Sequence, residues 1–172
     1  MGSSNNQRKI YFCVLWADAI RLEVSGNGLS GTIPVNDGQW HHVAVVYDPT
    51  LTNYIKLYVD GVLDVEGTLT VSLDTGSAIN MRIGQRVDAA KLFDGKIDEV
   101  RVWNTAKSQS EIQASMNGEL CSIPADLKAY YRFNNGVADG TNKGLNTVSD
   151  LSGTSTNANL VNFALSGTSS NW

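Results

Sequence analysis

The stretch DGQWHHVAVVYD, residues 37–48, places two adjacent histidines beside a tryptophan at the start of an apolar run. Successive residues of a strand point to opposite faces, so His41 and His42 would face away from each other and could not grip one metal ion. Both faces of the run are largely apolar, which predicts an interior strand of a sandwich with cover on both sides. An Asp-Gly pair enters this strand and an Asp-Pro pair ends it. The two histidines are therefore expected to be structural.

Strand patterns recur on both sides of this stretch with short polar gaps, which favours an all-β protein. YIKLYV (54–59) alternates, with Tyr54 and Tyr58 opposite the apolar face, and Asp60-Gly61 predicts a two-residue hairpin turn. The glycine-rich SGNGLSG (25–31) is expected to be a loop. Further strands are expected at AIRLEV (19–24), VLDVEG (62–67), AINMRIG (78–84), GKIDEVRVW (95–103), AYYRFN (129–134) and NLVNFAL (159–165).

One helix is expected where SQSE (108–111) forms a capping box ahead of IQASM, with Gly118 as the stop. At the N-terminus, KIYFCVLW and AIRLEVSG predict a hairpin that turns near Ala17-Asp18, in preference to a signal peptide with an A-x-A cleavage site. We expect residues 1–8 to be a disordered terminus or an expression scar. Residues 9–172 are expected to form a single domain, with the main sandwich over 9–118 and a C-terminal strand–loop–strand segment over 119–172.

Composition excludes two classes of partner. The net charge is −4 with 17% charged residues, and the basic residues are scattered, whereas a nucleic-acid-binding domain would cluster them. No apolar run approaches the ~18 residues that spanning a bilayer requires, so membrane insertion is not expected. Whether the two cysteines, Cys13 and Cys121, form a disulfide is left open.

Candidate catalytic residues are sparse. Asp64 and Glu66 would share a strand face at spacing i, i+2, as paired carboxylates of a glycosidase do. They follow a tight turn directly and a third acid is missing, so we expect a solvated hairpin end and no enzyme.

Three segments together resemble a known family: NDGQWHHVAVVYD (36–48), IKLYVDGVL (55–63) and FDGKIDEVRVWNTAKSQSEI (93–112). They are similar to the laminin-G-like, concanavalin A-like lectin/glucanase jelly rolls of bacterial secreted proteins. The resemblance implies an all-β, two-sheet antiparallel β-sandwich with one short helix, a secreted or cell-surface location, frequent calcium binding, and a role in adhesion or glycan binding. A structural, self-associating domain without a sugar ligand is the alternative, and a degenerate glycoside hydrolase a weaker one.

The chain departs from the family pattern at its start, where two strands that usually precede the segment matching KIYFCVLW are absent. Open sheet edges invite pairing with another chain. We therefore expect a homodimer formed through these edges.

Calcium is the candidate cofactor, and a loop held by its own hydrogen bonds is the other interpretation of the same residues. The resemblance places a calcium-associated segment near Asp150, Ser152 and Asn157, and alternation puts Asp98 on one face with Val100 and Val102, where a carboxylate needs a cation or backbone donors. Glu99 and Arg101 would pair on the opposite face. An Asx-rich loop held by its own hydrogen bonds is the alternative to a metal site.

A glycan is the expected ligand. Exposed aromatic rings stack on sugar faces while amide and carboxylate groups fix the hydroxyls in a largely preformed site. The residues expected to do this are Tyr54, Tyr58, Asp139 and Asn142, although any one ring could instead fill the core.

Overall fold

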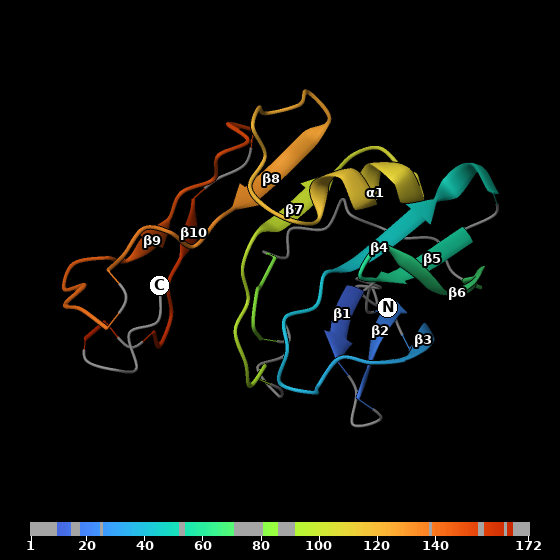
Figure 1. Ribbon diagram of the computed structural model, residues 1–172, viewed down its shortest axis with the longest axis horizontal. Coiled ribbons are helices and arrows are strands. Elements are labelled where there is room, and N and C mark those ends of the chain that lie inside the picture. The colour runs from blue at the N-terminus through green and yellow to red at the C-terminus, as the bar shows by residue number, and fades with distance from the viewer. Residues whose placement is uncertain are drawn as a thin grey trace, which may run out of the picture. The chain divides into compact units, whose positions relative to one another are not determined.

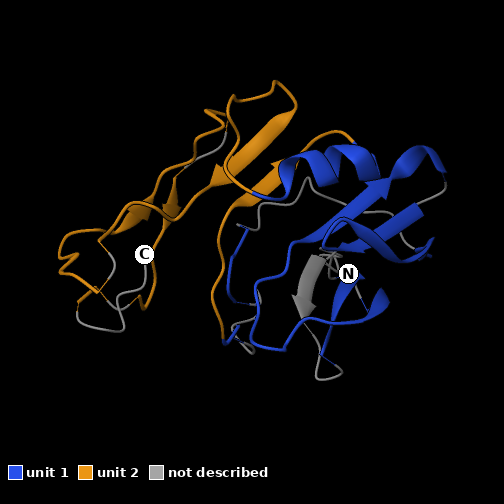
Figure 2. Ribbon diagram, viewed as in Figure 1, with its two compact units in different colours: residues 1–94, 106–117 blue, residues 95–105, 118–172 orange. Residues whose placement is uncertain are grey.

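The computed structural model describes residues 10–14, 18–24, 26–51, 54–70, 81–85, 92–137, 139–154, 157–163 and 165–166. The chain divides into two compact units (Figure 2). Unit 1 comprises residues 1–94 and 106–117, and unit 2 comprises residues 95–105 and 118–172. The expected N-terminal segment 1–8 lies outside the described residues.

Unit 1 contains two antiparallel three-stranded sheets, and in each the strands are consecutive along the chain (Figure 1). The predicted N-terminal hairpin is confirmed, because Ile10 pairs with Val24 and Val14 with Ile20. The first sheet is β1 (Ile10–Val14), β2 (Ala19–Val24) and β3 (Asn27–Pro34), and the second is β4 (Val43–Asp48), β5 (Tyr54–Val59) and β6 (Val62–Thr68), with a 3-10 helix η1 at Pro49–Leu51.

The core of unit 1 lies between the central strands of the two sheets. Alternate residues of β2 and of β5 are almost fully buried and form one apolar cluster with Leu69. Period-2 burial is what a strand gives when one of its faces packs against another sheet. The two-sheet antiparallel sandwich predicted from the sequence is therefore confirmed. The cluster from the two strands is Ile20, Leu22, Val24, Ile55, Leu57 and Val59.

The predicted hairpin turn and helix are both confirmed. Asp60 and Gly61 have φ values of 50° and 72°, as a type I′ turn requires. The α1 helix (Gln109–Ser115) begins with the expected capping box between Ser108 and Glu111. Two glutamines on one side of α1, Gln109 and Gln113, donate to Gly61 O at 2.8 and 2.9 Å, which fastens the helix to the β5–β6 turn.

The expected loop over residues 25–31 is wrong, because β3 occupies residues 27–34 and pairs with β2. Its glycines serve close packing. A Cβ at Gly28 would lie 2.5 Å from Leu22 O, and one at Gly31 would lie 2.1 Å from Asp64 Oδ2. The loop was predicted from glycine content alone, but glycine also occurs in strands where another group packs closely against the backbone.

β4 differs from its expected interior position. Among the described strands it pairs only with β5, and all six of its residues are partly exposed. The strand also starts at Val43, so Trp40 lies before it and is 66% exposed. An apolar pattern predicts that the two faces of a strand are buried. It does not predict whether the strand has a hydrogen-bonded neighbour along each of its edges.

Unit 2 holds two short antiparallel pairs. The first joins β7 (Val100–Trp103) to β8 (Leu127–Tyr131), and the second joins β9 (Thr147–Val148) to β10 (Ala158–Asn159). Residues 95–105 thus belong with the C-terminal segment, because their strand pairs with β8. Cys121 is exposed and its thiol is free.

Four expected strands are shorter, shifted or missing. The strand expected over 129–134 lies at Leu127–Tyr131, and residues 132–134 are outside it. The strand expected over 95–103 starts only at Val100, because Glu99 has a φ of 54° and the chain turns there. Residues 81–84 form no strand, while 78–80 lie outside the described residues. Of 159–165, only Asn159 lies in a strand, and the following described residues are irregular.

Candidate functional site

Three of the four expected metal ligands meet beside β8. Asp150 Oδ1 accepts hydrogen bonds from the Tyr130 N–H at 2.8 Å and the Ser152 N–H at 3.0 Å, and Oδ2 accepts from Ser152 Oγ at 2.7 Å. Asn157 Oδ1 accepts from the Asp150 N–H at 3.0 Å. We call Asp150, Ser152 and Asn157 the Asp150 network. It ties the loop after β9 to the middle of β8.

Asp98 is placed differently from the expectation. It precedes β7, is exposed, and accepts a hydrogen bond from the neighbouring Glu99 N–H at 2.8 Å. It does not share a strand face with Val100 and Val102, because the left-handed turn at Glu99 interrupts the alternation. None of the described contacts joins Asp98 to the Asp150 network.

The fit to calcium rests on the Asp150 network alone. A carboxylate, a hydroxyl and an amide oxygen are the hard ligands that Ca²⁺ prefers. Both carboxylate oxygens of Asp150 already accept hydrogen bonds, and the described residues contain no group of three or more His, Cys, Asp or Glu side chains that could hold a metal. The network therefore has the form of the expected alternative, an Asx-rich loop held by its own hydrogen bonds, and an ion bound there would have to share the Asp150 carboxylate with these protein donors.

The two expected aromatic residues have different environments. Tyr54 is partly exposed at the start of β5, with Lys56 Nζ 5.8 Å from its ring centroid, and partial burial with the neighbouring Glu66 carboxylate raises its pKa. Tyr58 is only 3% exposed, which corrects the expectation that it faces outward. Both faces of β5 are covered at this end, since Leu57 and Val59 are buried as well. Only Tyr54 of the pair offers part of its ring at the surface.

The expected polar ligands also separate. Asp139 is exposed in a turn with a φ of 55°. Asn142 is 5% exposed and its side chain clamps Val137: Oδ1 accepts from the Val137 N–H at 2.8 Å, and Nδ2 donates to the Val137 carbonyl at 2.9 Å. Asn142 is therefore a structural amide that stands in for a backbone partner, and is not placed to fix a sugar hydroxyl.

A charged cluster lies along β7 and β8. The predicted pairing of Glu99 with Arg101 is confirmed. Glu99 Oε2 also accepts from the Tyr130 hydroxyl at 2.6 Å, and the Arg101 guanidinium lies 5.2 Å from the Tyr130 ring centroid. Burial, and after it the Glu99 carboxylate, raises the pKa of Tyr130. The cluster thus holds Tyr130, near the C-terminal end of β8, against β7 and the residue before it.

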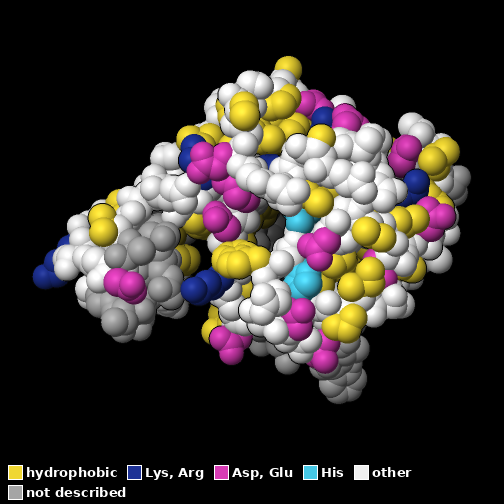
Figure 3. Space-filling model, in the orientation of Figure 1, with side chains coloured by type: hydrophobic (Ala, Val, Ile, Leu, Met, Phe, Trp, Pro, Cys, Tyr) yellow, Lys and Arg dark blue, Asp and Glu magenta, His cyan; other side chains and the backbone are white. Residues whose placement is uncertain are grey.

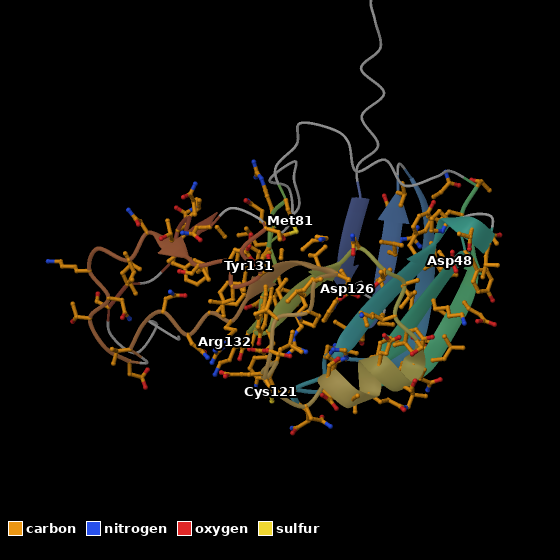
Figure 4. The ribbon with its side chains drawn as sticks, turned by 90° about the horizontal axis from the view of Figure 1, so that it is seen from above. Asp48, Met81, Cys121, Asp126, Tyr131 and Arg132 are labelled. Carbon is orange, nitrogen blue, oxygen red and sulfur yellow. The ribbon has the colours of Figure 1, made fainter. Side chains whose placement is uncertain are left out.

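The residue after β8, Arg132, has a partly exposed side chain beside this cluster (Figure 4). Its Nη2 pairs with Glu119, which raises the pKa of the guanidinium. Its Nε lies 3.8 Å from Glu99 Oε1, and this buried nitrogen has no hydrogen-bond partner. Asn134 Nδ2 donates to the same Glu119 oxygen at 3.0 Å.

A hollow of about 270 Å³ opens beside these groups. We call it the polar hollow. It offers a guanidinium, two amides and a hydroxyl, together with one apolar wall from Leu151, which is 40% exposed. Such a combination suits a small polyhydroxylated ligand, since amides fix hydroxyls and a short apolar wall takes a C–H face. The hollow is lined by Arg132, Asn134, Asn135, Ser149 and Leu151.

None of these lining residues was predicted from the sequence to bind a ligand. The available signal was RFNN (132–135), a cation and two amides directly after a strand whose residues are buried. Ser149 and Leu151 flank Asp150, so the same loop that holds the Asp150 network supplies the other wall. The site could have been found only by pairing two segments whose nearest residues lie 14 positions apart in the sequence.

Unit 1 has a histidine between two carboxylates. His41 Nδ1 lies 2.8 Å from Asp60 Oδ2, and Nε2 lies 3.0 Å from Asp37 Oδ1. The hydrogen bond to Asp60 has the largest effect and that to Asp37 the next, and both raise the pKa of His41 above its ordinary value of 6.5. Asp37 also accepts from the Gln39 N–H, and Asp60 from the His42 N–H. Histidine and acidic side chains meet at one face of the molecule (Figure 3). Each acid orders a turn, so this arrangement is structural.

The candidate catalytic pair is likewise engaged in structure. Asp64 accepts from the Thr32 N–H at 3.0 and 2.9 Å and from Thr32 Oγ1 at 2.7 Å, which links β6 to β3. Glu66 lies 3.8 Å from Lys56 Nζ on the same sheet. The two carboxylates therefore have separate partners in unit 1, on different strands.

No helix among the described residues is long and apolar enough to cross a membrane. A family model described as the concanavalin A-like lectin/glucanases superfamily matches residues 1–113. The match includes the sandwich, ends within α1 and stops before the residues of the polar hollow.

Three known proteins are similar to the chain. The rat "Sushi, von Willebrand factor type A, EGF and pentraxin domain-containing protein 1" is 31% identical over 91 residues, 46% of this chain and 2% of that protein. A crystal structure of a "putative carbohydrate binding protein" from Bacteroides ovatus superposes with a TM-score of 0.62 and 22% identity, over 88% of this chain and 50% of that one. An S-layer domain-containing protein from Clostridium thermocellum superposes with a TM-score of 0.41 and 19% identity, over 66% of this chain and 65% of that one. The chain thus spans half the length of the Bacteroides protein and a small part of the rat protein.

Proposed function

Because the chain belongs to the concanavalin A-like lectin/glucanase superfamily, we propose that it is a non-catalytic carbohydrate-binding or adhesion module that acts at the cell surface or outside the cell. The observation that carries the proposal is the polar hollow of unit 2, whose amides, hydroxyl, guanidinium and apolar wall match the chemistry of a sugar ring. A Bacteroides protein of the same fold that is described as carbohydrate-binding supports the same class of ligand.

The test is a glycan array followed by titration of the best ligand. Asn135 lines the hollow, and no described side chain hydrogen-bonds to it, so Asn135→Ala should weaken binding by about 5- to 10-fold, the loss of one hydrogen bond or more, and leave the fold intact. Asn36→Ala, at an exposed asparagine of unit 1, is the matched control and should bind as the wild type does. An array without a single bound glycan, or equal binding by both variants, would overturn the assignment of the hollow.

We propose that calcium stabilises the loop that contains Ser149 and Leu151. The Asp150 network would hold the ion weakly, in the millimolar range typical of extracellular modules (about 10⁻⁴–10⁻³ M). Millimolar calcium should then raise the melting temperature of the wild type and leave that of Asp150→Asn unchanged relative to the same variant in EGTA. An identical melting temperature of the wild type in calcium and in EGTA would end the proposal.

A self-associating domain is the second candidate, and the edge of β4 favours it. The Asp60 N–H donates to His42 O at 2.8 Å, so residues 42 and 60, just beyond the two strands, continue the register of β4 and β5 at a hydrogen-bonded position. Such positions alternate along antiparallel strands, which turns the backbone groups of Val43 and Val45 away from β5. Among the described strands none pairs with that side. A second copy of the chain could add a strand there.

A further inference from the structure

Two of the hydrogen-bond donors that line the polar hollow are already bound to a carboxylate of the chain, that of Glu119. Glu119 Oε1 accepts from Asn134 Nδ2 at 3.0 Å and pairs with Arg132 Nη2. Both donors line the hollow, whereas Glu119 does not. A guanidinium and an amide that converge on one carboxylate oxygen form a donor pair suited to an acid group.

Arg132 retains capacity for a further carboxylate. Its planar guanidinium has five N–H donors in a fork that matches the two oxygens of a carboxylate. Within the described part of the chain, Glu119 pairs with Nη2, Glu99 Oε1 lies 3.8 Å from the buried Nε, and no described group bonds to Nη1, which is therefore the nitrogen left for a ligand. Asn135 and Ser149 add donors for neighbouring hydroxyls on other sides of the same hollow.

The pair between Glu119 and Arg132 is exchangeable. The Glu119 side chain is 50% exposed and that of Arg132 33% exposed, so water competes for both. Exposed ion pairs of this kind contribute little to stability, and an incoming carboxylate can replace one partner at small cost.

We propose that the polar hollow binds a carboxylated sugar residue, a uronic acid, through Arg132 and Asn134, and that Glu119 competes with the sugar's carboxylate for this donor pair. The proposal rests on the carbohydrate-binding function proposed above and deepens it. At about 270 Å³ the hollow is near the lower end of ligand sites, which span roughly 300–1,000 Å³. It therefore takes one sugar residue, at the end or on a branch of a glycan.

The experiment titrates galacturonic acid, galactose and galactose 6-sulfate into the whole chain. Binding is followed by calorimetry and by the side-chain amide NMR signals of Asn134 and Asn135. We expect wild type to prefer galacturonic acid over galactose. Glu119→Gln should tighten galacturonic acid about 5-fold and leave galactose unchanged, because only the acid meets the competitor. Arg132→Gln should abolish the preference for the acid.

Arg132→Lys guards against a folding defect in Arg132→Gln, since it keeps the charge and loses the fork. Its melting temperature should match that of the wild type, which shows that it folds, and it should lose at least half of the preference for galacturonic acid over galactose. Equal binding of galactose and galacturonic acid by the wild type would overturn the inference and leave the proposed function standing. Galactose 6-sulfate binding as tightly as galacturonic acid would overturn the assignment to a planar carboxylate. Absence of binding by all three sugars, together with an empty glycan array, would overturn both proposals.

Discussion

At the scale of single residues, two side chains of unit 1 hold segments that are distant in sequence. His41 joins the turn before β4 to the turn after β5 through Asp37 and Asp60. Asp64 joins β6 to β3 through Thr32. Neither role was visible in the sequence, because a histidine or an aspartate beside a strand does not reveal which distant atom it meets. The prediction that the histidines are structural concerned their faces on the strand and did not anticipate these partners.

The stability contributed by His41 should depend on pH. Its pKa is raised in the folded state, so the contribution is fully present below the ordinary value of 6.5 and is lost as pH rises through the folded pKa. We expect wild type to melt about 1–3 °C above His41→Gln near pH 6, and the gap to close by about pH 9. Thermal melts of both proteins across this range provide the measurement. A gap that stays constant with pH would refute the role assigned to the imidazolium.

Substitution of Asp64 should destabilise the sandwich without affecting sugar binding. Asp64→Ala leaves the Thr32 N–H and hydroxyl without their carboxylate and should lower the free energy of unfolding by about 1–2 kcal/mol in urea titrations. Glu66→Gln, which loosens only the exposed pair with Lys56, should cost less than about 0.5 kcal/mol. Hydrolysis of a polysaccharide that is lost in either variant would instead restore the glycosidase alternative.

At the scale of elements, patterns of period two and turn chemistry predicted β2, β5, β6 and α1 well. These elements have an apolar face with polar neighbours, or a local cap that needs no distant partner. The β3 strand was missed because its glycines serve contacts with Leu22 and Asp64, which no local pattern encodes. The start of β7 was misplaced because Glu99 adopts a left-handed conformation that non-glycine residues rarely take.

The α1 helix should depend on its capping box. Ser108→Ala removes the acceptor of the Glu111 N–H and a donor to the Glu111 carboxylate, which should cost about 1 kcal/mol of unfolding free energy. Ser108→Asp should preserve most of the stability, because aspartate is an equally good N-cap. Chemical denaturation would measure both, and equal loss in the two variants would show that the cap is not what matters there.

At the scale of the whole molecule, the sequence predicted the sandwich but not the position of the polar hollow, where we propose that a sugar binds. The polar hollow draws its walls from residues 132–135 and from 149–151, outside the part that matches the family model. Of the residues expected to bind a sugar, Tyr58 and Asn142 are buried. The prediction placed aromatic and amide groups by composition, whereas their availability depends on which neighbours cover them.

We expect two copies of the chain to associate through the edge of β4 that pairs with no described strand. We expect multi-angle light scattering at high concentration to report a dimer for the wild type and a monomer for Val43→Pro, which removes an outward N–H at the first residue of the strand. Val43→Ala loses the same packing but keeps the N–H, so it should remain dimeric. A wild-type monomer at every concentration would refute this edge as an interface.

The order of strands in unit 1 has a kinetic consequence. Each sheet is a meander of consecutive strands, residues 10–34 in one and 43–68 in the other, so its backbone ladders join residues that are near in sequence. Short closures cost little chain entropy, and hairpins form within about 1–10 μs. We therefore expect the two meanders to form separately, and the slow step to be their docking, which buries the apolar cluster and makes the Thr32–Asp64 hydrogen bonds. Such a chain should refold faster than a sandwich of equal size whose strands interleave between the sheets.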